Sequence, residues 1–232
     1  MKNIYQQIGT MMLAIVLVVS LYACKKDAYL TDGGLNKAAT PFTTYDYLKN
    51  NQYHQFDTLI TLIDHYKLKD SVNNSKTFFA FTDMALNSLM KSIIIKTTDK
   101  NGNLILTPVT TISQLTDSIS SKLIKQYMFN QTITLDKATL AAVPYTNMAG
   151  TAAPCAIKKV AAANALNLAY TSLTLNYYIL AYVKVNGVLD GSAGAPANDK
   201  PDAVYYCQTE GIQTSSGTTL HVLANNVSLY KL

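Results

Sequence analysis

The clearest pattern of apolar and polar positions lies between residues 76 and 90. Thr77–Phe81 is a run of aromatic and β-favouring residues, which predicts a buried strand. Four apolar residues then follow at the spacing of one helix face: Ala85, Leu86, Leu89 and Met90. We therefore expect a strand that passes into a helix at Thr82. The Thr82 side chain should cap this helix, and Asp83 places negative charge near the positive end of the helix dipole.

Two helices are predicted before this strand. Thr43 with Asp46 three residues later has the form of a helix start, so Tyr45–Asn50 should be a short helix with Thr43 as its N-cap. A second helix follows, because apolar residues recur there at i, i+3 and i+4: Phe56, Leu59, Ile60, Ile63 and Tyr66. The apolar stripe continues to Val72.

A hairpin is expected after the central helix. Asp99-Lys100-Asn101-Gly102 separates two β-favouring runs, Ser92–Thr98 and Asn103–Val109. Asn-Gly is a strong signal for a tight hairpin turn. The pattern predicts a surface excursion.

The next stretch has helical spacing. Apolar residues recur at this spacing over Ile112–Phe129, which predicts one long amphipathic helix. We expect a short strand over Thr132–Leu135 and a short helix over Asp136–Val143.

The last third of the chain changes to a β pattern, rich in Tyr, Thr, Leu and Val and divided by glycine-containing turns. The predicted strands are 166–175, 177–185, 203–209, 218–223 and 227–230. Helices followed by strands indicate the α+β class. With 232 residues, 49% of them hydrophobic, the chain can bury one good core, so residues 42–232 are expected to form a single domain.

The N-terminus has the pattern of an export signal. Residues 1–23 have a lysine at position 2, continue through an apolar run of about ten residues and end in a small residue. Leu21-Tyr22-Ala23-Cys24 resembles the bacterial lipobox, in which the cysteine is acylated; the alternative is an ordinary cleaved signal that stands beside a cysteine. The residue after Cys24 is not Asp, which favours the outer membrane. Residues 24–41 are polar and predict a flexible tether.

Lys25-Lys26-Asp27 further resembles the charged export signals of surface lipoproteins in Bacteroidota-type bacteria. We therefore expect an outer-membrane protein, at the cell surface or facing the periplasm. Lipid attached at Cys24 would be its contact with the membrane.

Composition narrows the chemistry. All 19 basic residues are lysine, Glu210 is the single glutamate, and tryptophan is absent. A guanidinium fork for phosphates or carboxylates is thus missing. The net charge of +5 is spread along the chain, which argues against a nucleic-acid groove.

Apart from Cys24, the chain has two cysteines, Cys155 and Cys207. In an oxidising compartment they could pair or stay free. Neither belongs to a C-x-x-C pattern, so zinc binding and redox chemistry are not expected.

No catalytic motif stands out. The three histidines, His54, His65 and His221, do not have the spacing of a metal site, and no nucleophile or phosphate-loop motif occurs. A carboxylate pair for glycoside hydrolysis would have to come from three aspartates of a turn and loop: Asp190, Asp199 and Asp202. The simpler interpretation is that these aspartates form the loop and are solvated. We therefore expect no enzyme, metal or cofactor.

Three blocks in order resemble the fasciclin domain, an extracellular adhesion module. The first runs from Phe56 through Thr77-Phe78-Phe79-Ala80-Phe81-Thr82-Asp83, with Phe81 where the family usually has proline. The second is Leu123–Phe129, in which Tyr127 replaces the family's histidine. The third is Gly211–Leu223, a glycine turn and a strand ending in His221-Val222. The family-motif positions are thus Thr77, Phe79, Thr82, Asp83, Tyr127 and His221.

The resemblance implies a wedge of two β-sheets with helices packed along one side. It also implies adhesion, or recognition of an extracellular protein or polysaccharide. The alternative function is an accessory glycan-binding lipoprotein in polysaccharide capture, which rests on tyrosines of the C-terminal strands. The ligand-binding candidates among them are Tyr177, Tyr205 and Tyr206. Alternation along strands also explains these tyrosines as sheet packing.

Overall fold

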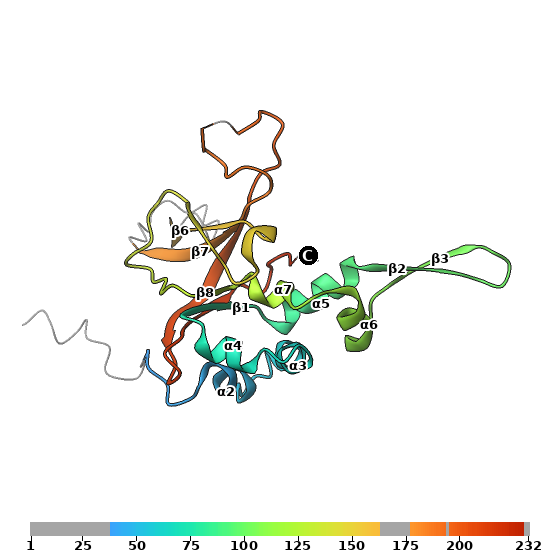
Figure 1. Cartoon of the computed structure of the whole chain (residues 1–232), viewed down its shortest axis with the longest axis horizontal. Coiled ribbons are helices and arrows are strands. Elements are labelled where there is room, and N and C mark those ends of the chain that lie inside the picture. Colours follow the sequence, from blue (N-terminus) through green and yellow to red (C-terminus); the bar gives the residue numbers. More distant parts are fainter. Residues whose placement is uncertain (1–37, 163–176, 194, 230–232) are drawn as a thin grey trace, which may run out of the picture. The chain divides into compact units, whose positions relative to one another are not determined.

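The computed structural model describes residues 38–162, 177–193 and 195–229 (Figure 1). Within them the chain is mixed α+β, with six α-helices, a seven-stranded sheet and a separate two-stranded hairpin. The predicted signal segment 1–23, the predicted lipid-attachment residue Cys24 and the predicted strand 166–175 lie outside the described residues.

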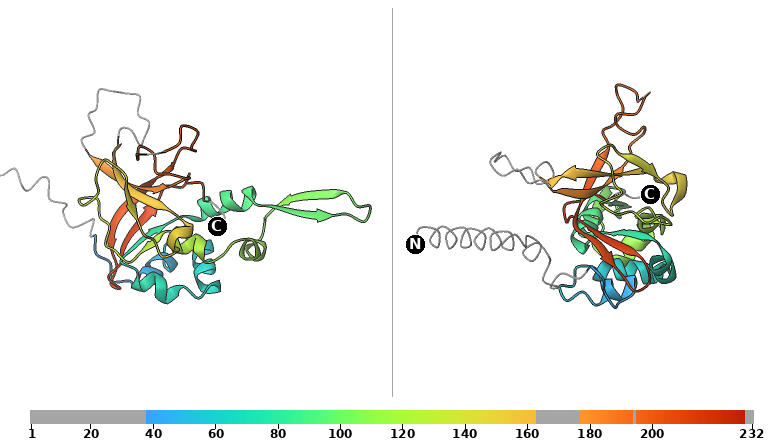
Figure 2. Two further views of the ribbon diagram at one scale, coloured as in Figure 1. Left: turned by 45° about the horizontal axis from the view of Figure 1, so that its top comes forward. Right: turned by 90° about the vertical axis from the view of Figure 1, so that its left-hand side faces the viewer.

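The seven-stranded sheet is strongly curled (Figure 2) and has the order β4-β1-β9-β8-β7-β6-β5. Its strands are β1 (Thr77–Ala80), β4 (Met128–Phe129), β5 (Val143–Tyr145), β6 (Cys155–Ala161), β7 (Tyr178–Lys184), β8 (Ala203–Gln213) and β9 (Thr219–Leu223). Only the β1–β9 pair is parallel; the other neighbours in this sheet are antiparallel. The central strand predicted from the aromatic run is confirmed, and it lies between β4 and β9.

Strand β8 joins the two halves of this sheet. Its first residues pair with β7 as far as Tyr206, and its later residues pair with β9 from Cys207 onward. The β8–β9 register shifts twice, and Gly211 has a positive φ of 73°, so the strand bends where it changes partner. The expected end of this strand at Thr209 was therefore wrong, because bulges carry it on to Gln213.

The N-terminal helices agree with the sequence pattern. They are α2 (Thr44–Lys49), α3 (Asp57–His65) and α4 (Lys69–Asn74), and Figure 1 shows them together near β1. The Thr43 hydroxyl accepts a hydrogen bond from the Asp46 N–H at 3.2 Å, which confirms the predicted cap of α2. The domain begins earlier than Phe42, because Ala39 already pairs with Gln213 of β8.

The helix after the central strand, α5 (Asp83–Ser92), begins where predicted, but its cap differs. The Thr82 hydroxyl makes no cap hydrogen bond and donates instead to Oδ1 of Asn225 at 2.9 Å. The Asp83 carboxylate accepts hydrogen bonds from the N–H groups of Thr58 and Leu59, at the start of α3. It therefore caps a neighbouring helix.

The predicted long helix over 112–129 was wrong. It divides into α6 (Ile112–Ser118) and α7 (Lys122–Lys125), and the chain then enters β4. At the break, the Tyr66 hydroxyl lies 3.2 and 3.0 Å from the carbonyl oxygens of Thr116 and Ile119. The Tyr66 hydroxyl thus donates to carbonyl oxygens that, in a continuous helix, would accept hydrogen bonds from backbone N–H groups.

Three other short predictions were also wrong. The segment 132–142 has neither the expected strand nor the expected helix, and no strand forms over 227–229. The Ile133 N–H donates to the Thr77 hydroxyl at 2.8 Å, which holds the chain against β1 without a ladder. Tertiary contacts outweigh the weak local preferences here.

The predicted hairpin is confirmed as β2 (Ile94–Thr98) and β3 (Leu104–Pro108), with Gly102 at a φ of 83° in the turn. It extends away from the seven-stranded sheet in Figure 1 and in the left view of Figure 2. Several of its apolar side chains are exposed, among them Leu104 and Leu106.

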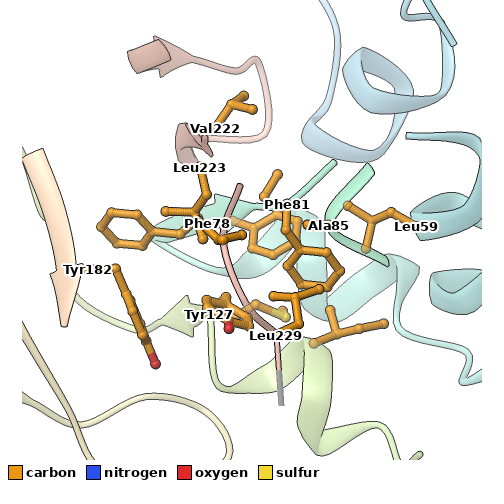
Figure 3. Packing of buried hydrophobic residues seen from close by; sticks show 14 of the residues in the cluster. Leu59, Phe78, Phe81, Ala85, Tyr127, Tyr182, Val222, Leu223 and Leu229 are labelled. Atoms are coloured by element: carbon orange, nitrogen blue, oxygen red, sulfur yellow. The ribbon is translucent and has the colours of Figure 1, made fainter. Parts of the chain in front are cut away.

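One buried cluster connects the helices with the curled sheet. Figure 3 shows its centre, where Phe78 and Phe81 of the central segment pack near Tyr127, Tyr182 and Leu223. Most of the apolar residues chosen from periodicity, such as Leu59 and Leu86, are fully buried in it.

Candidate functional site

The family-motif positions converge on the middle of the sheet. Phe79 of β1 pairs with His221 of β9, and its N–H donates to the Tyr127 carbonyl at 2.9 Å. The Phe79 ring stacks on the His221 ring with centroids 4.8 Å apart. Three segments, between 48 and 142 residues apart in the sequence, thus form one aromatic core.

His221 is a packed core residue. Its side chain is fully buried, Nε2 lies 3.0 Å from the Ile133 carbonyl oxygen, and Nδ1 accepts from the Gly211 N–H at 3.2 Å. These contacts fit the neutral ring with the proton on Nε2. Burial lowers the pKa of His221 to about 4, because the charged ring would lose its hydration. With both nitrogens engaged, His221 does not serve as a ligand group.

Thr77 and Tyr127 also have structural roles. The Thr77 hydroxyl donates to the Gln131 carbonyl at 2.8 Å, in addition to accepting from Ile133. The Tyr127 ring is buried and lies 4.9 Å from the Tyr182 ring and 5.2 Å from the Phe81 ring. The motif positions therefore shape the core of the domain.

The pairing of Cys155 with Cys207 is not formed, and both residues are buried free thiols. The register explains this: Cys155 of β6 lies opposite Lys184, and β7 separates β6 from β8. Two strand spacings amount to about 10 Å, beyond the roughly 7 Å limit between Cα atoms of a disulfide. Burial raises the pKa of both thiols, so they are poor nucleophiles.

The candidate tyrosines do not form one stripe. Tyr205 is buried, and its hydroxyl donates to the Ser228 carbonyl. Its ring stacks on Tyr182 with an interplanar angle of 7°. Tyr205 and Tyr182 therefore pack within the sheet, as the packing interpretation predicts. Tyr206 is half-buried and lines a different hollow from Tyr177. Tyr177 is 49% exposed and opens on a pocket of the sheet surface.

That pocket has a volume of about 600 Å³, within the usual range of ligand sites. Its walls come from the loop after β4, the middle of β6, the start of β7, the bend within β8, and β9. The lining residues are Thr134, Leu135, Asp136, Lys159, Tyr177, Tyr178, Glu210, Gly211 and His221. Of these, the sequence had suggested only Tyr177 as a ligand-binding residue.

The charged groups of the pocket differ in environment. Burial raises the pKa of the Glu210 carboxyl, which is partly offset by a hydrogen bond from the Leu180 N–H to Oε1 at 2.7 Å. The Thr134 hydroxyl lies close enough to lower the pKa of the exposed Asp136 carboxyl, although the two groups are not in hydrogen-bonding geometry. The Lys159 ammonium lies 5.4 Å from the centroid of the Tyr178 ring.

The loop aspartates hold their own loop together. Asp202 accepts from the N–H groups of Asn186 and Asp190, and Asp190 accepts from the Asp202 N–H. Asp199 accepts from the Val188 N–H at 2.8 Å. These carboxylates are thus occupied by backbone donors, as expected of loop-forming residues.

Among the residues that the structure describes, no three His, Cys, Asp or Glu side chains gather as metal ligands. Within the same residues, no helix is long and apolar enough to cross a bilayer. Neither a scan against models of known protein families nor a search of curated proteins finds a match to this chain.

Proposed function

We propose that this chain is a lipid-anchored protein of the bacterial outer membrane whose fasciclin-type domain binds an extracellular protein or polysaccharide. The observation that carries the proposal is the meeting of the three motif segments at Phe79, Tyr127 and His221. A chance resemblance of separate segments would not require them to be neighbours in space. The pocket supports binding, because it combines exposed aromatic rings with a few polar groups.

The arrangement of the strands supports the fasciclin-like wedge. β8 divides the curled sheet into a β4-β1-β9 half and a β7-β6-β5 half, which correspond to the two sheets of a wedge. Helices α2 to α4 lie together near the β1 half, as helices along one side would.

The anchor is tested by membrane fractionation. Cys24→Ala removes the thioether-forming side chain, and the protein should then move from the membrane fraction to the soluble fraction, since lipid chains supply its membrane affinity. Cys155→Ala is the control, because this thiol is buried in the sheet. Retention of the Cys24→Ala protein in the membrane fraction would contradict the lipoprotein proposal.

Binding is tested with beads that carry the full chain with Cys24→Ala. The cells used in the assay lack the protein. The control beads carry the same chain unfolded by Phe79→Asp, which places a charge in the fully buried core. The beads with the folded chain should adhere to the cells more strongly than the control beads. Equal adhesion of the two bead types would contradict a recognition role.

A further inference from the structure

The pocket exists because two strands separate. The β7–β8 ladder stops at Ala181 and Tyr206, and β8 then bends toward β9. The Leu180 N–H, left without a strand partner on that side, donates to the Glu210 carboxylate at 2.7 Å. A side chain thus takes the place of a backbone partner and holds a charged group at the opening between the strands.

The pocket has an aromatic wall. Tyr177 and Tyr178 are 49% and 41% exposed, although rings of this size are usually more deeply buried. Leu135 adds an apolar surface from the loop after β4. A ligand that fits this wall needs an apolar face to stack on the rings.

The charges limit which ligands suit this pocket. Asp136 and Glu210 would repel an anion, and they need hydrogen-bond donors from whatever displaces their water. Lys159 already places an ammonium over the Tyr178 ring, so a cation would meet a like charge there. An uncharged ligand with hydroxyl donors on its edge and C–H groups on its face suits both the carboxylates and the tyrosine rings.

We infer that this pocket binds a neutral saccharide unit, with its ring face on Tyr177 or Tyr178 and its hydroxyls donating to Asp136 and Glu210. The inference rests on the proposed recognition function and names its ligand class. Lys159 can donate to a ring or hydroxyl oxygen of the same sugar. A single pocket of this kind suits one or a few units of a longer polysaccharide chain.

Calorimetric titration tests the inference. The full chain with Cys24→Ala is titrated with three neutral probes, maltohexaose, cellohexaose and N-acetylchitohexaose, and with one acidic probe, hexagalacturonate. At least one neutral probe should bind more tightly than the acidic probe. Glu210→Gln should weaken that binding roughly tenfold or more, the usual loss for a hydrogen bond to a charged group.

A stability measurement on Glu210→Gln and two further variants, Tyr178→Ala and Tyr53→Ala, serve as controls for this titration. Glu210→Gln retains an oxygen for the Leu180 N–H, so its unfolding midpoint should stay close to that of the parent. Tyr178→Ala should also weaken binding, whereas Tyr53→Ala should not, because Tyr53 is an exposed tyrosine of a different hollow.

The inference fails if no neutral probe binds at about 10 mM, if both pocket variants bind like the parent, or if hexagalacturonate binds at least as tightly. Adhesion of the beads without any saccharide binding would overturn this inference alone. Loss of bead adhesion together with intact saccharide binding would overturn the adhesion proposal alone.

Discussion

The capping of α3 by Asp83 gives a quantitative prediction. Helix α3 begins after Phe56, whose side chain makes no cap hydrogen bond, and the Asp83 carboxylate accepts from Thr58 at 3.0 Å and Leu59 at 3.2 Å. Loss of a capping side chain costs about 0.5 to 2 kcal/mol, and loss of charge at a helix N-terminus adds about 0.3 to 1 kcal/mol. Asp83→Ala should therefore lower the free energy of unfolding by about 1 to 3 kcal/mol.

The assay is urea unfolding followed by circular dichroism, with Asp57→Ala as the control at the same helix end. Asp57 is 59% exposed and pairs with His54, so its removal should cost about 0.5 kcal/mol through the dipole alone. The loss in unfolding free energy for Asp83→Asn should lie between those of the two alanine variants, because the amide oxygen still accepts hydrogen bonds. Equal losses for Asp83→Ala and Asp57→Ala would refute the capping role.

Three other predictions concern single side chains. His221 is buried in its neutral form, with a pKa of about 4 against an ordinary value of 6.5. Its contribution to the free energy of unfolding, up to about 3 kcal/mol, is therefore full above pH 6.5 and is lost as the pH falls toward 4. His221→Gln should make the free energy of unfolding depend less on pH over this range. Gly187→Ala should lower the unfolding temperature, since a Cβ there would collide with the Asp199 carboxylate, whereas Gly191→Ala, with a similar φ and open space, should lower it less. Leu106→Lys, at a 56% exposed position, should change the unfolding free energy by less than about 0.5 kcal/mol in urea titration.

Elements with strong local signals could be predicted from the sequence. The cap of α2 by Thr43, the hairpin turn at Gly102 and the passage from β1 to α5 depend on residues within a few positions of each other. Such signals act before tertiary contacts form, and the structure keeps them.

Features set by distant residues could not be predicted. The break before α7 involves Tyr66, about 50 residues earlier in the chain, and the Thr82 hydroxyl turns to Asn225, 143 residues away. The continuation of β8 past Thr209 depends on a change of partner strand. Periodicity carries no information on any of these contacts.

The pocket shows the same limit. Tyr177 could be selected because it belongs to a tyrosine-rich run of predicted strands, but Asp136, Lys159 and Glu210 come from three separate segments. The one available signal was that Glu210 is the single glutamate of the chain. Its importance arises from the Leu180 N–H, which only the separation of β7 from β8 leaves unpaired in the ladder.

The most direct test of saccharide recognition by this domain is amide chemical-shift mapping during titration with the tightest neutral oligosaccharide. A sugar at Glu210 should shift the Leu180 and Gly211 amide resonances first, because Leu180 donates to that carboxylate and Gly211 adjoins it. If Leu180 and Gly211 stay unchanged while amides near Tyr53 move, or if no resonance moves, the proposed binding pocket is wrong.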